Sequence, residues 1–154
     1  MLLTSESPIT HQQSPLPFSW PTRIYWEDTD AGGVVYHARY VAFMERARTE
    51  WMRAMGYGQE DMRRGDGQVF VVRAMTLDFL KPAKLDDALQ VTVELLQCRR
   101  ASLIIEQAVS RDGQPLVTAQ VRLAAVGARD FRPQAMHDTL YATLKRFETQ
   151  HVQD

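Results

Sequence analysis

A single long helical pattern, followed almost entirely by strand-like runs, limits the architectures open to this chain. Apolar residues recur at helical spacing across residues 37–55, and Gly56 stands where such a helix would end. Residues 69–80, 88–98, 102–110 and 116–126 predict strands, with a hairpin turn at 111–114. Short connections favour antiparallel pairing, and strands do not alternate with helices as a parallel doubly wound sheet requires. The sequence therefore predicts an α+β fold with one helix against one antiparallel sheet.

The two ends of the chain differ from this central pattern. Residues 1–19 are rich in Ser, Pro, Gln and Thr, so we expect a mobile tail ahead of a single domain at 20–154. A short strand is expected at 22–27, a turn or short helix at 59–64, and a C-terminal helix between Pro133 and Phe147. Three histidines outside the central pattern, His11, His137 and His151, are expected to be surface residues.

Composition excludes several classes of function. The chain has 18 basic and 19 acidic residues, so no net field favours nucleic acid or an anionic membrane. It contains neither a membrane-spanning apolar run nor a secretory signal, so a cytoplasmic protein is expected. The one cysteine, Cys98, cannot form an intrachain disulfide, and its strand-like surroundings predict a structural thiol.

Two surface features follow from the pattern of side chains. On the helix, Arg46 with Glu50 and Glu45 with Arg48 have the i,i+4 and i,i+3 spacings of ion pairs that stabilise a helix. In the sheet, apolar residues fall on both faces, as at Leu95–Leu96 and around Ile104. Because one helix covers one face, we expect the second face to be buried by self-association.

The stretch before the long helix carries the candidate chemistry. Asp28 and Asp30 precede the Gly32-Gly33 pair, and His37 marks the start of the helix. Asp and Gly are also ordinary turn residues, so this loop has a purely structural reading as well. A helix N-terminus, however, offers unpaired N–H groups and a partial positive charge, which suit an anion or a developing oxyanion.

Three alternative chemistries fit this loop less well. Asp28, Asp30 and Gly33 match positions one, three and six of a calcium loop, but Arg39 stands where its glutamate should be. Asp28 and Asp30 also resemble the acid pair of haloacid-dehalogenase-type, magnesium-dependent phosphatases, which need a parallel sheet. A serine hydrolase is disfavoured because no Gly-x-Ser-x-Gly motif is present.

A resemblance to a known family rests on residues 25–40, which run YWEDTDAGGVVYHARY, and continues at 41–50, 70–76 and 80–87. These residues are similar to those of hotdog-fold acyl-CoA thioesterases of the 4-hydroxybenzoyl-CoA thioesterase class, especially the Tol–Pal-associated bacterial ones. The resemblance implies a hotdog fold, in which an antiparallel sheet wraps a long central helix. It also implies homodimers or homotetramers with active sites at subunit interfaces, and no metal or cofactor.

The same resemblance assigns residue roles. It implies that Asp30 acts as nucleophile or general base and that the backbone N–H of His37 binds the oxyanion. It further implies substrate contacts from Gly33, Tyr36, Val72 and Arg73. The implied substrate is acyl-CoA or acyl carrier protein, and the alternative is a non-catalytic acyl-binding scaffold linked to the cell envelope.

Five basic residues are candidates for contacts with substrate phosphates or with a partner chain. Arg39 replaces the small polar residue common in the family, and we expect it to be exposed, with a phosphate or a partner-chain acid as the other possible contacts. Lys81, Lys84, Arg99 and Arg100 are candidates for contacting CoA phosphates.

Overall fold

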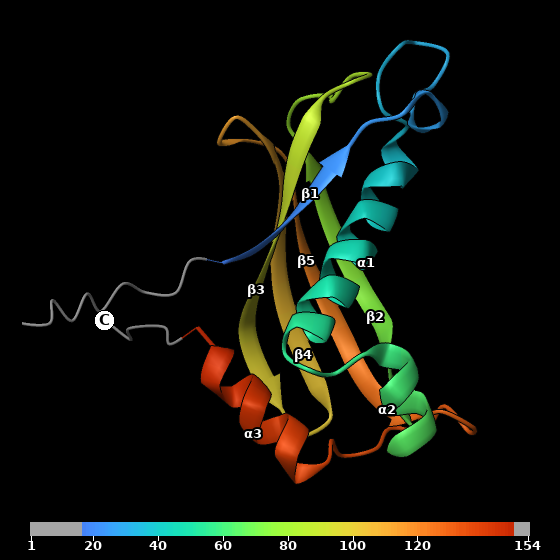
Figure 1. Ribbon diagram of the computed structural model, residues 1–154, viewed down its shortest axis with the longest axis vertical. Coiled ribbons are helices and arrows are strands. Elements are labelled where there is room, and N and C mark those ends of the chain that lie inside the picture. The colour runs from blue at the N-terminus through green and yellow to red at the C-terminus, as the bar shows by residue number, and fades with distance from the viewer. Residues whose placement is uncertain (1–16, 150–154) are drawn as a thin grey trace, which may run out of the picture.

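A computed structural model describes residues 17–149 and contains one antiparallel sheet crossed by one long helix (Figure 1). The five strands lie in the order β1-β3-β4-β5-β2, and every pairing is antiparallel. Their bounds are β1 Phe18–Arg23, β2 Gln68–Phe79, β3 Ala88–Arg99, β4 Ser102–Arg111 and β5 Gln114–Gly127. The helices are a 3-10 turn η1 at Trp26–Asp28, α1 at His37–Ala54, α2 at Gln59–Gly65 and α3 at Asp138–Phe147. The predicted α+β class is confirmed.

Helix α1 packs its apolar stripe onto the sheet. Six apolar side chains of the helix are buried: Tyr40, Phe43, Met44, Ala47, Trp51 and Met52. Val41 and Ala54 are exposed, because the sheet contacts only one side of the helix. The helix ends as predicted, with Gly56 in the left-handed region at φ +90°.

The hairpin and the bulges explain the strand pattern. Asp112 and Gly113 both have positive φ, as expected for the turn between β4 and β5. The β3–β4 register shifts at Leu96, so the Leu95–Leu96 pair marks a bulge and not a second apolar face. The face away from α1 is largely polar, with Thr76, Glu94, Glu106, Gln120 and Arg122 across its middle. The expectation of an apolar second face was therefore wrong.

The chain ends are placed differently from the prediction. Strand β1 already begins at Phe18, inside the predicted tail, and the expected strand at 22–27 ends at Arg23 before η1. Residues 1–16, which make up the rest of that tail, lie outside the described part, as do His11 and His151. Beyond the start of β1, where Phe18 pairs with Val93, the edge of β3 is occupied by Thr149, whose N–H donates to Leu95 O at 2.8 Å.

The ion pairs predicted along α1 do not form as expected. Glu50 pairs with Arg53 instead of Arg46, and Arg48 is buried against Gln107 instead of pairing with Glu45. Cys98 is buried, as expected of a structural thiol, and burial raises its pKa to about 11. None of the helices within 17–149 is long and apolar enough to cross a membrane.

Candidate functional site at the start of helix α1

The loop between η1 and α1 is a tight turn closed by its own backbone. Thr29 and Val35 pair across its base, and the Asp30 N–H donates to Val34 O at 2.8 Å. The Gly33 N–H then donates to Asp30 O at 3.0 Å, with Gly33 at φ +82°. A residue with a Cβ is strained in that conformation, so the glycine allows the chain to turn back toward the helix.

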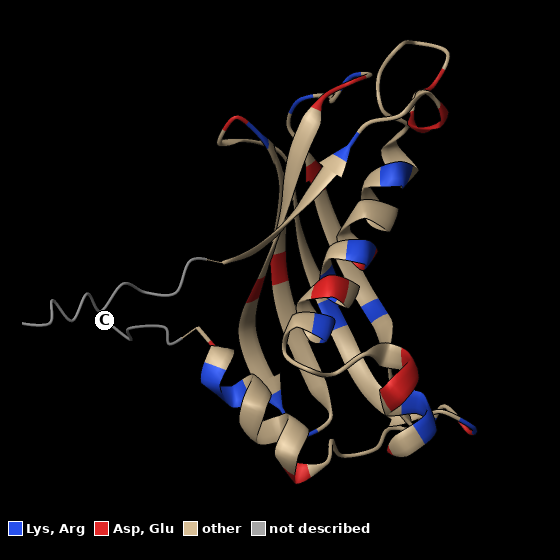
Figure 2. Ribbon diagram, in the orientation of Figure 1, with Lys and Arg blue, Asp and Glu red and all other residues tan. Residues whose placement is uncertain are grey.

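Asp28 holds this loop against the first turn of α1. Its carboxylate is buried, and it accepts hydrogen bonds from Tyr25 N (2.9 Å) and from Arg39 Nε and Nη2 (2.8 and 2.6 Å). Figure 2 shows acidic positions in the segment that precedes α1 and a basic position near the start of that helix. Arg39 is therefore not the free surface cation that was expected. Asp28 is also unable to attack phosphorus, because its oxygens already accept hydrogen bonds from Arg39 and Tyr25. Phosphatases of that type need a parallel sheet, and this sheet is antiparallel. The phosphatase hypothesis was therefore wrong.

Asp30 lies in the opposite environment. Its side chain is exposed, and Oδ1 accepts the Gly32 N–H at 2.8 Å. A Cβ on Gly32 would lie 3.2 Å from this oxygen, so the glycine also leaves room for the carboxylate. The Asp30 carboxylate therefore faces solvent and is held in place by the Gly32 N–H.

The start of α1 is open to a ligand. Tyr36 precedes the helix at φ −62° and ψ 131°, and among the described residues no side chain caps the helix. His37, the first helical residue, lines a cavity of about 270 Å³ together with Val35, Tyr40, Phe79, Leu80, Lys81 and Pro82. First-turn N–H groups have no partner within the helix and carry partial positive charge. This end can therefore bind an anion or an oxyanion.

A buried tyrosine ties the helix start to the neighbouring loop. The Ala83 N–H donates to Tyr40 Oη at 3.0 Å, and Ala83 O accepts from Val35 N at 2.9 Å. Burial raises the pKa of Tyr40, so its hydroxyl stays protonated at neutral pH. The loop that carries Asp30 is thus fastened to α1 through Ala83.

The other predicted contact residues do not join this group within one chain. Val72 is half exposed and lines a second cavity, near the middle of α1, whereas Arg73 is the bulge residue of β2. Arg99 and Arg100 lie at the other end of the sheet, where Arg100 pairs with Asp138 at 2.7 Å. Lys81 and Lys84 do lie beside the helix start, in the loop after β2. Gly33 and Tyr36 flank Asp30 and His37 directly.

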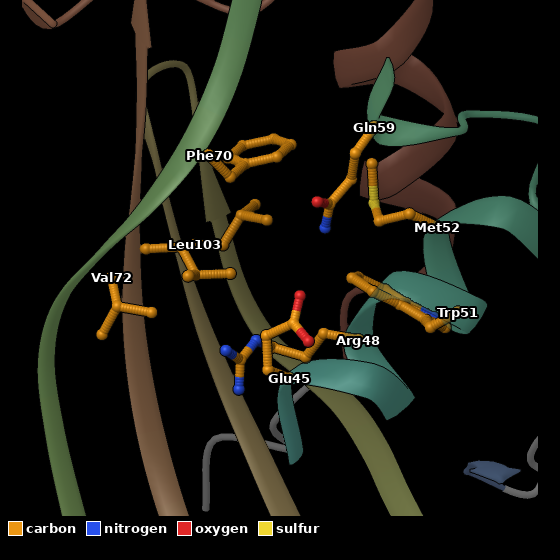
Figure 3. Close-up of a pocket in the computed structure, with 9 residues that line it drawn as sticks. Glu45, Arg48, Trp51, Met52, Gln59, Phe70, Val72 and Leu103 are labelled. Carbon is orange, nitrogen blue, oxygen red and sulfur yellow. The ribbon is translucent and has the colours of Figure 1, made fainter. Parts of the chain in front are cut away.

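The second cavity contains residues that sequence reasoning missed. Arg48 reaches from α1 toward the sheet into a space of about 110 Å³ (Figure 3). The guanidinium donates to Gln107 Oε1 at 2.8 Å. The sequence does contain one indication that Arg48 is buried. Arg48 lies four residues after Met44 and next to Ala47, so it falls on the apolar face of the helix.

Comparison with known proteins places these features in a family. A model of the thioesterase-like superfamily matches residues 24–144. The acyl-CoA thioesterase YbgC of Haemophilus influenzae is 43% identical over 118 residues, covering 77% of this chain and 87% of that protein. The acyl-CoA thioester hydrolase YbgC of Escherichia coli O157:H7 is 42% identical over 130 residues, covering 84% and 96%. A crystal structure of a probable thioesterase from Bartonella henselae is similar with a TM-score of 0.75 and 34% identity, covering 77% and 98%.

Proposed function

The chain belongs to the thioesterase-like superfamily, with the hotdog fold, and from that membership we propose that it hydrolyses acyl-CoA to a free acid and CoA. The observation that carries the proposal is the uncapped start of α1 next to the exposed carboxylate of Asp30. Hydrolysis forms a C–O bond, breaks the C–S bond and releases the thiol. An oxyanion develops on the thioester carbonyl during that step, and the helix start is a fitting place to bind it.

Asp30 supplies the attacking oxygen or activates the water that attacks. Both roles need an accessible carboxylate, and Asp30 is exposed whereas Asp28 is buried. Turnover in water enriched in a heavy oxygen isotope separates the two roles, because hydrolysis of a mixed anhydride at its aspartyl carbonyl leaves the label in the Asp30 carboxylate, whereas direct attack of water labels only the product acid.

The oxyanion role of the His37 N–H has a clean test. Proline at the first helical position keeps the helix but removes the N–H, and Tyr36 already has the extended backbone that precedes proline. We expect His37→Pro to lower kcat by about 10²–10³-fold with an unchanged fold. His37→Ala keeps the N–H and is the matched control, with kcat close to wild type. Equal activity in both variants would contradict the oxyanion assignment.

Asp30→Asn tests the chemistry as a whole. Thiol release is measured with short, long and aromatic acyl-CoAs and with acyl carrier protein thioesters, which present the same pantetheine arm. We expect wild-type turnover on at least one substrate and a loss of at least 10²-fold in the variant. Binding of acyl-CoA without turnover would point instead to a non-catalytic acyl-binding scaffold.

We also propose a homodimer formed through the free edge of β2. Two copies related by a two-fold axis pair the same edge strand antiparallel, so the Phe79 end of one copy meets the Gln68 end of the other. His37 lies next to Phe79, with ring centroids 6.3 Å apart. Each helix start would then approach the partner's Val72 and Arg73 and its 110 Å³ cavity. The exposed apolar side chains of Val72, Phe79 and Leu80 support an interface there.

A further inference from the structure

Arg48 is a buried cation that forms no ion pair within residues 17–149. Its residue is only 7% exposed, at the centre of α1. Among the residues that the structure describes, no carboxylate forms an ion pair with it. Its partner is the neutral amide oxygen of Gln107 at 2.8 Å.

Gln107 is fixed in the orientation that serves Arg48. Its Nε2 donates to Met44 O at 3.1 Å and to Thr92 O at 3.3 Å, which leaves Oε1 facing the guanidinium. The amide is 1% exposed. The arginine side chain is thus held in one position by the fold, although its side-chain hydrogen bond goes to a neutral amide and not to a carboxylate.

Burying an arginine without an ion pair costs folding free energy, so a charge kept at such a position points to an anionic ligand. A buried ion is stabilised only when it is paired and well hydrogen-bonded, and an apolar residue of similar volume is often at least as stable. Burial accordingly lowers the pKa of Arg48, although the charge of Glu45 partly offsets this. Glu45 itself is exposed and accepts a hydrogen bond from Thr49 Oγ1 at 3.0 Å.

The guanidinium lies in the wall of a cavity of about 110 Å³, whose other polar lining residues are Glu45 and Gln59. Figure 3 shows Arg48 among the residues that line it, with Glu45 beside it. The apolar walls come from Trp51, Met52, Phe70, Val72, Leu103 and Leu123. A few methylene groups and one small polar head group would fill such a space.

We propose that this cavity binds the far end of an acyl group that carries a terminal carboxylate, with Arg48 as its counter-ion. This inference rests on the proposed thioesterase function and on the proposed dimer, because Arg48 lies eleven residues after His37, about 16 Å along α1, and only the partner's helix start would bring the thioester near the cavity. It narrows the substrate to the CoA monothioesters of short dicarboxylic acids. A carboxylate supplies the charge that Arg48 lacks, and its charge-assisted hydrogen bonds form in a site shielded from water. The apolar walls contact the methylene groups between the carboxylate and the thioester.

Hydrolysis of matched substrate pairs provides the test. Succinyl-CoA and glutaryl-CoA are compared with butyryl-CoA and valeryl-CoA, which have a methyl group in place of the carboxylate. We expect kcat/KM to favour the acidic member in the wild type and this preference to fall about 10–100-fold in Arg48→Met/Gln107→Leu. That double variant removes the charge without leaving the Gln107 oxygen unpaired, so we expect it to fold. Arg46→Met, on the exposed side of the same helix, should keep the preference.

Two further arms make the result decisive. Glu45→Gln removes a nearby negative charge, so it should increase the preference for the acidic substrates. 4-Hydroxybutyryl-CoA can form hydrogen bonds but carries no charge, and an equal gain with it would overturn the proposal.

Binding separates this inference from the proposed function. Non-hydrolysable S-carboxyalkyl-CoA and S-alkyl-CoA thioethers are titrated by calorimetry, and an Arg48-dependent preference for the first should appear whether or not the chain turns over. Turnover of butyryl-CoA without any preference for acidic substrates or thioethers would overturn the inference and leave the thioesterase intact. Absence of turnover on every substrate would overturn the thioesterase instead.

Discussion

At the scale of single residues, two aspartates close together in the loop have opposite environments. Asp28 is 2% exposed and accepts three hydrogen bonds, two of them from Arg39. Asp30 is exposed and accepts one hydrogen bond, from Gly32. A saturated buried carboxylate holds a structure together, whereas an exposed one with free oxygen lone pairs is available to react. The loop thus separates a supporting acid from a candidate catalytic acid.

This division predicts a difference in stability. Asp28→Ala leaves Arg39 and Tyr25 N without their acceptor, so we expect a loss of about 2–4 kcal/mol in the free energy of unfolding. The measurement is urea denaturation, with Glu27→Ala as the control because Glu27 is exposed and 3.9 Å from Arg39. The control should change by no more than about 0.5 kcal/mol. Equal unfolding midpoints for the two variants would show that the Asp28 contacts add nothing to stability.

At the scale of elements, the site depends on three segments meeting at one point. The Asp30 loop, the start of α1 and the loop after β2 are joined by the chain of hydrogen bonds from Tyr40 through Ala83 to Val35. The first two segments follow one another in sequence, whereas the loop after β2 comes much later in the chain. The position of Asp30 relative to the helix start is therefore set by a contact that crosses the fold.

Removing the Tyr40 hydroxyl tests that contact. Tyr40→Phe leaves the fully buried Ala83 N–H without an acceptor, so we expect a loss of about 1–3 kcal/mol in stability and a lower kcat. Tyr57→Phe removes a hydroxyl at the far end of α1, where it lies 3.4 Å from Thr143 Oγ1, and serves as the matched control. We expect the control to keep wild-type kcat. If both variants lose kcat equally, Tyr40 does not position the site.

At the scale of the whole molecule, the structure changes the reason for expecting self-association. The sheet face opposite α1 is polar, with Glu94 directly across from Glu106. Several of the exposed large apolar side chains lie instead along β2 and at the helix start, at Val72, Phe79, Leu80 and Tyr36. A free strand edge next to apolar side chains favours edge-to-edge pairing of two copies.

Two substitutions distinguish the edge from the face. Val72→Lys places a charge at the β2 edge, and we expect it to shift the dimer toward monomer in sedimentation and to lower kcat/KM in parallel. Gln120→Lys places the same charge on the polar face of the sheet and should leave both quantities unchanged. Dissociation by Gln120→Lys alone would move the interface to the face. A wild-type monomer at micromolar concentration would remove the interface altogether.

The sequence by itself determined the elements and the candidate loop. The extent of α1, the hairpin at Asp112-Gly113 and the antiparallel pairing of consecutive strands from β3 to β5 were predictable, whereas the pairing of β2 with β5 was not. These features depend on helical or strand periodicity and on local turn chemistry, which act over a few residues. The Asp30 loop was likewise recognisable from its own contiguous residues.

The tertiary structure alone decided the partners. Arg48 and Gln107 are 59 residues apart, and spacing along the helix predicted Glu45 for Arg48 instead. The environments of Asp28 and Arg39 and the polar face of the sheet also escaped prediction. The physical reason is that burial depends on which element packs against a side chain, and that choice is made across the fold and not within a local segment.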